Sequence, residues 1–553
     1  MTSRQFHSRW RFFDAAALIA ACILATTALS AFAADPASAA APNPAQQQVS
    51  RDFQKTLSLG AGGSFSIENK FGEVRVHGES SREVKISATI RVQAGTREEA
   101  DAYAQKVQID VLQTGNAIFV RTVYPEEERR LLHGRNTSYS VNYDIAMPSD
   151  APINVKNSFG SVTATGVHGR ADIDNSHGSL TVSQAGPSKL NNSFGSIELH
   201  DANGDSFVND NNGSVDVSGV KGALDLRNRF GSITVREVQG TATINGGNGQ
   251  VTIDTTGAAS ISTSFGGADV RNVRGDLILH DNNGNVEVAA VAGSATISNS
   301  FGNVTFADVK GRISVTTNNG KVEGRNISGD SLTVRDSFGN IELENISGSV
   351  DAETSNGRLA LRDARGTVNL RTSFGAIEAS NIPKGIRAVT GNGAIELSEI
   401  GGDTYAKTSY GSISVTHVNG NFTADDSNGS VTARRVKGDA TVTTSFSGVN
   451  LEDIGGKITV DNQNGAISVA SRPASGCRDI SLKTSFSSIR VAIPEGNYTL
   501  TSHTSFGRIT SDIPVTATGS IGGDSLNGTI GSGGGCRLQL TNSNGAIEIV
   551  KSN

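Results

Sequence analysis

The sequence has few of the residues that build a thick globular core. Only 5% of its 553 residues are aromatic, and it has 3 Cys, 2 Met and 1 Trp, whereas glycine occurs 64 times. A chain of this length normally divides into several globular domains. Scarce aromatics combined with abundant glycine argue against one thick core and favour a repeated unit that buries a thin strip of side chains.

An excess of charge of one sign is also lacking. The formal net charge is -6, charged residues make up 18% of the chain, and Lys and Arg are spread along its length. This distribution predicts no concentrated basic surface, so we expect no nucleic-acid partner.

Motifs for catalysis and ligand binding are absent. The sequence contains no His-Glu-x-x-His, no Cys-x-x-Cys and no P-loop, because Gly320-Lys321 and Gly456-Lys457 lack the Ser or Thr that must follow. Its 9 histidines do not have the spacing of metal ligands. We therefore expect no catalytic, cofactor-binding or metal-binding residues, no cofactor, and a protein that is not an enzyme. The charged run 126–130 is expected to be a solvated loop.

The N-terminus has the pattern of an export signal. Arg4, Arg9 and Arg11 precede an apolar run from Ala15 to Phe32, and Ala31-Phe32-Ala33 is typical of a cleavage site. We predict a signal peptide over residues 1–33. Two alternatives remain open, a retained membrane anchor and a lipid attached at Cys22. Residues 34–50, rich in Ala, Pro and Gln, are predicted to be a disordered linker.

A two-residue marker recurs about every 18 residues from Phe159 to Asn464. It alternates between Phe-Gly and Asn-Gly, and His177-Gly178 and Tyr410-Gly411 are variants of it. The Phe form starts at Phe159, Phe194, Phe230, Phe265, Phe301, Phe338 and Phe374, and the Asn form at Asn212, Asn248, Asn283, Asn319, Asn356 and Asn392. A short fixed period indicates one small unit stacked many times.

Each repeat holds two alternating strands of about five residues and two glycine turns. A unit this short cannot bury a face alone, whereas stacking in parallel satisfies the backbone of every strand. The fold class is therefore an all-β, single-chain parallel β-solenoid (β-helix). We favour about 18 residues per turn, with Phe and Asn in one column. The alternative, a turn of twice that length, would stack Phe on Phe and Asn on Asn.

The domain organisation follows from where the repeat is regular. Residues 51–155 are predicted to be a β-rich N-terminal cap with one short helix starting near Arg97, because Thr96 and Glu99 form a capping box. Residues 156–475 are the regular solenoid. Marker spacing loosens after Asn464, so residues 476–553 are predicted to be less regular solenoid turns.

Strand parity predicts that the marker phenylalanines are buried. Leu226, Asn228 and Phe230 share one phase, so Phe230 should point inward with the leucine. On this interpretation Phe265→Ala would cost roughly 3–5 kcal/mol. The alternative is an exposed aromatic stripe that stacks on sugar rings. The marker asparagines are predicted to be corner residues that bond to the backbone.

The two cysteines of the mature chain are predicted to be free thiols. Cys477 and Cys536 occupy the same place in the repeat, about three turns apart in chain order. Three strand spacings amount to roughly 14 Å, which is beyond the reach of a disulfide.

The chain resembles the bacterial putative adhesin family of β-strand-repeat proteins of unknown function. The similarity lies in the 72–78 segment GEVRVHG, in Met147-Pro148, in the repeated Ser-Phe/Asn-Gly-x-Ile/Val units, in 493–496 (IPEG) and in the closing 543–549 (SNGAIEI). The resemblance implies a secreted or envelope-associated, non-enzymatic β-solenoid and carries no catalytic residues over.

These observations favour an exported, adhesin-like or structural interaction protein of the cell envelope, in the periplasm, at the outer membrane or outside the cell. Its partner is unknown, with a glycan or an envelope or surface protein as candidates, and it would contact membrane only through an uncleaved or lipidated N-terminus. The alternatives are a carbohydrate-active β-helix enzyme (polysaccharide lyase or hydrolase) and a periplasmic sensory scaffold. The enzyme predicts two or three carboxylates on adjacent turns inside one groove.

Overall fold

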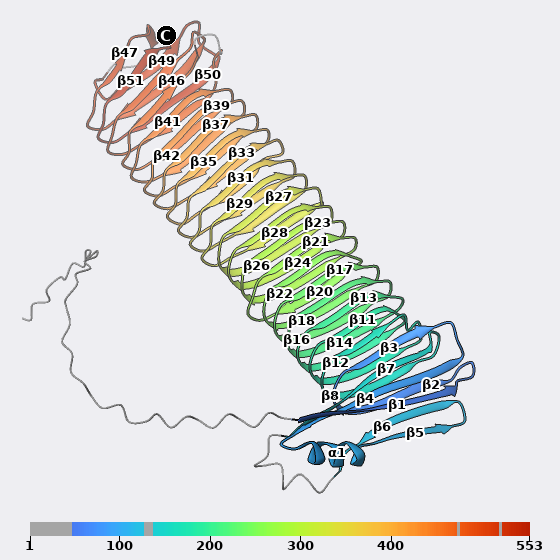
Figure 1. Ribbon diagram of the computed structural model, residues 1–553. Coiled ribbons are helices and arrows are strands. Elements are labelled where there is room, and N and C mark those ends of the chain that lie inside the picture. The colour runs from blue at the N-terminus through green and yellow to red at the C-terminus, as the bar shows by residue number, and fades with distance from the viewer. Residues whose placement is uncertain (1–46, 126–136, 473–475, 519–521, 553) are drawn as a thin grey trace, which may run out of the picture. The chain divides into compact units, whose positions relative to one another are not determined.

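The protein is a parallel β-solenoid, as the sequence predicts. The computed structural model describes residues 47–125, 137–472, 476–518 and 522–552. Residues 47–553 form one compact unit (Figure 1). The solenoid has about 19 turns of about 18 residues. The predicted signal peptide, the linker up to residue 46 and the charged run 126–130 lie outside the described residues.

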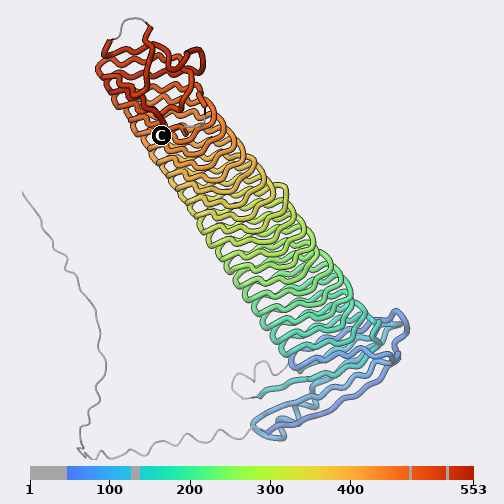
Figure 2. Tube along the Cα trace, turned by 90° about the horizontal axis from the view of Figure 1, so that it is seen from above, coloured from blue at the N-terminus to red at the C-terminus, as the bar shows by residue number. Residues whose placement is uncertain are grey.

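Each turn contributes one strand to each of two parallel sheets, here called sheet A and sheet B, whose inner faces pack against each other (Figures 1 and 2). Sheet A of the regular stack contains β9 (Val162–Thr165), β11 (Leu180–Ala185), β13 (Ile197–Ala202), β15 (Val215–Val220), β17 (Ile233–Val238), β19 (Val251–Thr256), β21 (Ala268–Val273), β23 (Val286–Val291), β25 (Val304–Val309), β27 (Val322–Ile327), β29 (Ile341–Ile346), β31 (Leu359–Ala364), β33 (Ile377–Ile382), β35 (Ile395–Ile400), β37 (Ile413–Val418), β39 (Val431–Val436), β41 (Val449–Ile454), β43 (Ile467–Ala470) and β45 (Ile489–Ile493). Sheet B contains β8 (Ile153–Phe159), β10 (Ala171–His177), β12 (Ser188–Phe194), β14 (Ser206–Asn212), β16 (Leu224–Phe230), β18 (Ala242–Asn248), β20 (Ala259–Thr263), β22 (Leu277–Asn283), β24 (Ala295–Phe301), β26 (Ile313–Asn319), β28 (Ser331–Arg335), β30 (Ser349–Glu353), β32 (Val368–Arg371), β34 (Ile386–Val389), β36 (Thr404–Lys407), β38 (Phe422–Asp425), β40 (Ala440–Thr444), β42 (Ile458–Asn462) and β44 (Ile480–Lys483).

The strand register decides between the two turn lengths. Phe301 lies opposite Asn283 in the turn before it and opposite Asn319 in the turn after it. Phe and Asn therefore interleave in a single column, and a turn takes about 18 residues. The alternative, a turn of twice that length, is wrong.

The core is a thin strip of aliphatic side chains between the two sheets. In sheet A, Val304, Phe306 and Val309 are buried, and Ala295 and Ile297 face them from sheet B. Because every strand repeats this alternation, each turn buries a similar set of small and medium side chains and satisfies its backbone through the turns above and below.

The corner that carries the marker breaks the strand phase. In β16 the burial alternates through Leu226 and Asn228, but Phe230 is exposed. The chain bends after the buried asparagine, whose amide donates to the carbonyls of Gly213 (2.9 Å) and Gly231 (3.3 Å). The bend turns the next alternate side chain outward. The prediction that the marker phenylalanines are buried is therefore wrong.

Buried polar side chains form an inward column two residues before each marker. This column consists of Asn, Asp or Thr in most turns, and Thr354 shows its role, because its hydroxyl donates to Gly339 O (3.2 Å) and accepts from Gly357 N (3.3 Å). The marker glycine itself lies against the neighbouring turn. A Cβ on Gly302 would lie 2.0 Å from Gly284 O, at a φ of +121°. Only glycine fits such a position.

Some members of the inward column are aspartates. Asp281 is 3% exposed, and the backbone N–H groups of Asn282 and Asn283 approach its carboxylate without the geometry of a full hydrogen bond. Burial raises its pKa to about 6. A carboxyl whose pKa is higher in the folded than in the unfolded state stabilises the fold at low pH, and this contribution is lost as the pH rises from about 4 to about 6.

We expect Asp281→Asn to stabilise the protein at neutral pH by on the order of 1–2 kcal/mol, and to have little effect near pH 4. The new amide can donate to glycine carbonyls as Asn299 does to Gly284 O (3.0 Å) and Gly302 O (3.2 Å). Urea denaturation at both pH values measures the difference. The reverse substitution, Asn299→Asp, should destabilise at neutral pH, and a pH-independent effect of either change would contradict the assignment.

The opposite corner uses a left-handed residue instead of a glycine. In β21 the backbone of Asn272 has a φ of 57°, so Arg271 and Asn272 both face outward and Val273 returns to the core. Among the described residues, fifteen that are not glycine adopt this conformation, about one per turn. Asn and Asp, which tolerate it best, occupy many of these positions.

The N-terminal cap contains the predicted helix, α1 (Arg97–Lys106), and Thr96 accepts from Glu99 N at its start. The other strands are β1 (Gln47–Ser58), β2 (Ser64–Phe71), β3 (Val74–Glu79), β4 (Glu83–Ala94), β5 (Gln108–Thr114), β6 (Ala117–Val123) and β7 (Ser138–Pro148). β1 begins at Gln47, inside the segment predicted to be linker. Antiparallel β4 and β1 close the edge of sheet A, and β5 closes that of sheet B.

Stack order differs from chain order at both ends. The β2–β3 turn lies between the β6–β7 and β8–β9 turns. The C-terminal strands are β46 (Tyr498–Thr504), β47 (Ile509–Ser511), β48 (Val515–Ala517), β49 (Ser525–Ile530), β50 (Cys536–Asn542) and β51 (Ile547–Lys551). The last turn, β50–β51, inserts between the β44–β45 and β46–β47 turns.

This insertion explains the disulfide of the chain. Cys477 precedes β44 and Cys536 begins β50, which is the neighbouring strand of sheet B. Their Cα atoms are 5.9 Å apart and their sulfurs are bonded. The prediction of two free thiols is wrong, because it counted turns along the chain, whereas the inserted turn brings the two cysteines together.

Candidate interaction surfaces

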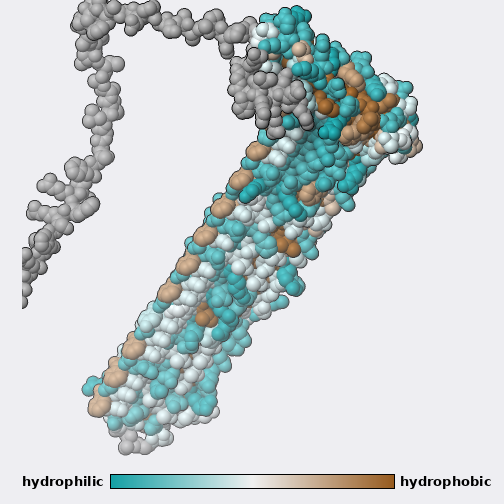
Figure 3. All heavy atoms as spheres, turned by 90° about the horizontal axis from the view of Figure 1, so that it is seen from below, coloured by the Kyte–Doolittle hydropathy of each residue, from teal (hydrophilic) through white to brown (hydrophobic). Residues whose placement is uncertain are grey.

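An exposed aromatic column runs along the marker corner. We call it the aromatic ladder and define it as the exposed rings at this corner, from Phe159 (44% exposed) to Phe506 (84%). Figure 3 shows it as a regularly spaced row of hydrophobic residues along one edge of the stack. Its members are Phe159, Phe194, Phe230, Phe265, Phe301, Phe338, Phe374, Tyr410, Phe446, Phe486 and Phe506. Single exposed apolar residues are ordinary, but an aligned series is a candidate interaction surface.

Rings on consecutive turns stack on one another at the N-terminal end of this corner. Here the ring of His177 lies between Phe159 and Phe194, with centroids 4.6 and 4.8 Å apart. Phe71 stacks on Phe159 from the other side, at 5.3 Å. Rings on neighbouring turns are therefore close enough to stack face to face.

Beyond Phe194 every second position holds asparagine. The pairs Asn283–Phe301 and Phe301–Asn319 are directly opposed, so successive rings are two strand spacings apart, about 10 Å. Two of the marker asparagines bond to the backbone through their side chains, as predicted: Asn428 Nδ2 donates to Ser409 O (3.0 Å) and Asn356 Nδ2 donates to Ser337 O (3.5 Å). The ladder thus alternates a projecting ring with a short polar side chain.

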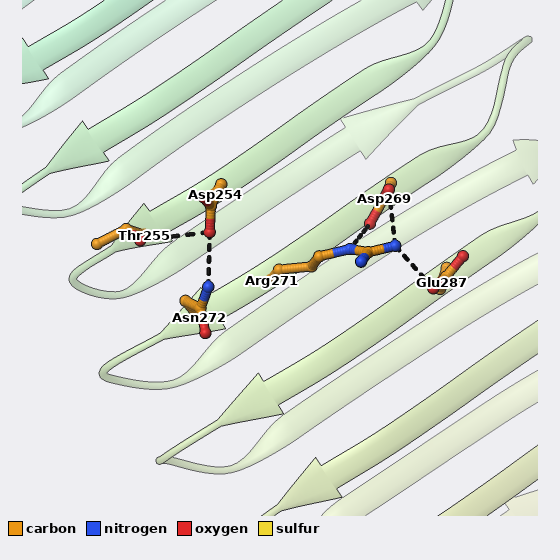
Figure 4. Close-up of polar contacts among 6 residues, drawn as sticks. All are labelled: Asp254, Thr255, Asp269, Arg271, Asn272 and Glu287. Carbon is orange, nitrogen blue, oxygen red and sulfur yellow. Dashed lines mark hydrogen bonds and ion pairs between the residues drawn. The ribbon is translucent and has the colours of Figure 1, made fainter.

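The outer face of sheet A is polar and is crossed by side-chain contacts between turns. Arg271 pairs with Asp269 on its own strand (2.8 Å) and with Glu287 on the next strand (2.9 Å) (Figure 4). Beside them Asn272 Nδ2 donates to Asp254 Oδ1 of the preceding turn (2.6 Å). Exposed pairs of this kind add little stability each, but they fix the outward side chains in rows.

Two adjoining hollows on this face, each of about 290 Å³, form a shallow groove that crosses β27 to β37. Arg358, Ala360 and Arg362 line both hollows. Small side chains make its floor, where Ala360 and Ser398 take the places that larger residues hold elsewhere on the face. We call this feature the sheet A groove.

This groove lies mainly within the segment that has recognisable relatives. Residues 268–385 match the Toastrack DUF4097 family. The match spans β21 to the start of β34 and confirms the predicted resemblance over this part of the chain. No curated protein matches the sequence.

Two solved structures also align with the solenoid. One is a putative cell adhesion protein from Clostridium sporogenes, at 10% identity and a TM-score of 0.17, with 50% of this chain and 100% of that chain covered. The other is a putative adhesin from Bacteroides fragilis, at 12% identity and a TM-score of 0.13, with 59% of this chain and 98% of that chain covered. Among the described residues, no helix is long and apolar enough to cross a membrane.

Carboxylates line the groove in one register column, and three of the four lie within residues 268–385. Glu323 lies opposite Glu342, and beyond Ala360 in the same column Glu378 lies opposite Glu396. This is the arrangement that the enzyme alternative predicts. However, Lys321 Nζ lies 2.5 Å from Glu323 and 2.7 Å from Glu342.

Arg358 sits among the remaining carboxylates. It forms an ion pair with Glu378, and the hydrogen bond to Glu378 raises the pKa of the guanidinium, as do the charges of Glu342 and Glu396. Glycoside cleavage needs one carboxyl that is protonated, whereas three of these four carboxylates are held in ion pairs with Lys321 or Arg358.

The sequence did not predict the sheet A groove. Its lining residues come from short segments of several successive turns, so they form no local motif, and only the strand register brings these segments together. Within the described part of the chain, no group of His, Cys, Asp and Glu side chains has the arrangement of a metal site.

Proposed function

We propose that this protein is an exported, non-enzymatic, adhesin-like interaction protein of the cell envelope, and that the sheet A groove binds an extended glycan. The observation that carries the proposal is the double row of outward-facing, mostly polar side chains in the groove. One row runs through Glu342, Ala360 and Glu378, and the row beside it runs through Glu344, Arg362 and Ser380.

This arrangement suits a hydroxyl-rich chain. Carboxylate and guanidinium groups accept from and donate to pairs of hydroxyls, and parallel rows repeat the same contacts from turn to turn. The small residues Ala360 and Ser398 leave room for a sugar ring to approach the sheet. The surrounding face is rigid, because every strand is bonded to both neighbours, so little ordering is needed on binding.

A glycan array with the purified protein tests the proposal. The double variant Arg358→Ala, Arg362→Ala should lose most of the signal, since both side chains line the groove. The matched control is Arg236→Ala, on the same face of β17, where Arg236 pairs with Asp216 (3.3 Å). Absence of any bound glycan, or equal loss in the control, would contradict the proposal.

The enzyme alternative is favoured by the adjacent carboxylates alone. If the protein cleaves a glycan that it binds, product analysis would show shortened chains, and Glu378→Gln or Glu396→Gln would abolish the cleavage even at glycan concentrations that saturate the groove. Bound glycan that stays unchanged after long incubation would support the non-enzymatic function.

Export is tested separately by cell fractionation of a producing strain. The proposal expects the mature chain outside the cytoplasm, with an N-terminus after Ala33 if the predicted signal is cleaved. Protein that stays in the cytoplasm with its N-terminus intact would contradict the envelope assignment.

A further inference from the structure

The rings of the aromatic ladder recur every two turns, and a second copy of the same chain has gaps at the same spacing. We propose that two copies of this protein associate side by side through their aromatic ladders, with the rings of each copy inserted over the asparagines of the other. This inference goes beyond the proposed function, because the ladder lies at the marker corner and the groove lies on the outer face of sheet A.

The first argument is the size of the gaps. Where rings occupy consecutive turns, His177 fits between Phe159 and Phe194 with centroid separations of 4.6 and 4.8 Å and interplanar angles of 17°. From Phe230 onward asparagine replaces the intervening ring, so each gap between rings has the width of one ring. A ring from a partner would complete the same stack.

The second argument is commensurate spacing. Rings that recur every two turns can insert into the gaps of a partner over many turns only if the partner's gaps recur at the same spacing. A second copy of this chain necessarily has that spacing. Symmetric pairing of one patch with itself is the commonest arrangement of protein dimers. From Phe194 onward the interleaved rows of Phe and Asn are complementary to themselves, because a shift of one turn places every ring of this stretch over an asparagine.

The third argument is the character of the corner. The rings are flanked by small uncharged residues, with Ser before and Gly after in units such as 264–266 and 300–302, and Arg229 is an exception. Opposed ladders would therefore meet without like charges directly facing each other. The outer faces carry the charged residues, and they remain free.

The buried area is sufficient for a stable pair. Eleven rings are 42% to 84% exposed, and each offers on the order of 100 Å². Two ladders would together bury roughly 2,000 Å², which is the area of a specific interface.

Sedimentation velocity of the purified full chain over a range of concentrations tests the proposal. The unmodified protein should form dimers at micromolar concentration. A ring-removal variant, Phe301→Ser, Phe338→Ser, Phe374→Ser, should weaken the association at least about tenfold. A monomer at all concentrations, or unchanged association of this variant, would overturn the proposal.

A gap-filling variant separates insertion from general stickiness. Asn283→Phe, Asn319→Phe, Asn356→Phe makes the corner more hydrophobic but blocks every gap in this stretch. Insertion predicts weaker association, whereas a merely sticky edge predicts stronger association, and the latter result would overturn the proposal. If either triple variant fails to fold, the single changes Phe338→Ser and Asn356→Phe repeat the comparison at exposed sites.

Two further readouts distinguish this site from others. Glycan binding by the sheet A groove should be unchanged in the ladder variants, so loss of association with intact glycan binding isolates the ladder. Flotation of the monomeric protein with neutral phosphatidylcholine vesicles that is lost in the ring-removal variant would show that the ladder contacts lipid, and that outcome would also overturn the proposal.

Discussion

Replacing Phe306 by alanine is expected to lower the stability of the solenoid by about 3–5 kcal/mol. Phe306 is fully buried in sheet A, and its ring occupies the space over Gly324 of the next turn, where a Cβ would lie 2.4 Å from the ring. The ring of Phe306 therefore fills the core space that a side chain at position 324 would occupy. Truncating the ring leaves a cavity that the rigid stack of strands cannot close.

The matched control is Phe301→Ala in the same turn. Phe301 is 54% exposed, so its removal should change stability by no more than about 0.5 kcal/mol. Urea denaturation of the two variants gives the comparison, and hydrogen exchange around β25 shows whether the loss is local. Similar effects of the two substitutions would contradict the inside-outside assignment of these side chains. Phe265→Ala should likewise be nearly neutral, in place of the large cost that strand parity predicts.

Removing the disulfide is the second change with a large expected effect. In the double variant Cys477→Ser, Cys536→Ser the closed loop spans a sequence separation of 59 residues. Opening a loop of this length is expected to cost about 4 kcal/mol through the entropy of the unfolded chain. Because the bond joins the inserted β50–β51 turn to the β44–β45 turn, the loss should be confined to the C-terminal end.

Thermal unfolding followed by hydrogen exchange measures this effect. A repeat protein need not unfold as a single unit, so we expect the C-terminal turns to lose protection at a lower temperature while central strands such as β25 keep theirs. The same protein under reducing conditions should behave like the double variant. Uniform destabilisation along the whole chain, or no change, would contradict the expectation that the disulfide stabilises only the C-terminal turns.

The regular part of the fold could be predicted from the sequence because its signal is periodic. A short fixed repeat with two alternating strands predicts two parallel sheets, and the capping box at Thr96 predicts helix α1. The strand pattern recurs in every turn, so the prediction does not depend on any single turn in which the pattern is weak.

The marker phenylalanines were predicted on the wrong side because parity holds only within a straight strand. Asn228 does face inward as its phase requires, but its bonds to Gly213 and Gly231 lie at the bend itself, and Phe230 follows that bend. A sequence pattern gives the phase of a strand and does not give the residue at which the strand ends.

The order of the C-terminal turns was missed although the sequence carries a signal for it. Read along the chain, the late markers run Asn464, Phe486, Phe506 and Asn544, and the alternation fails. In stack order Asn544 lies between Phe486 and Phe506, since Asn544 N donates to Ser485 O and Phe506 N donates to Ser543 O. The alternation is then restored, and the two cysteines become neighbours.

Disulfide trapping at the marker corner tests the central claim most directly, namely that ring and asparagine alternate in one column, one position per turn of the solenoid. The pair Asn283→Cys, Phe301→Cys occupies directly opposed positions on adjacent strands, within reach of a disulfide. The pair Phe265→Cys, Phe301→Cys lies two turns apart, at about 10 Å. Mass spectrometry after mild oxidation should show the cross-link in the first pair and free thiols in the second, whereas the opposite result would contradict the account.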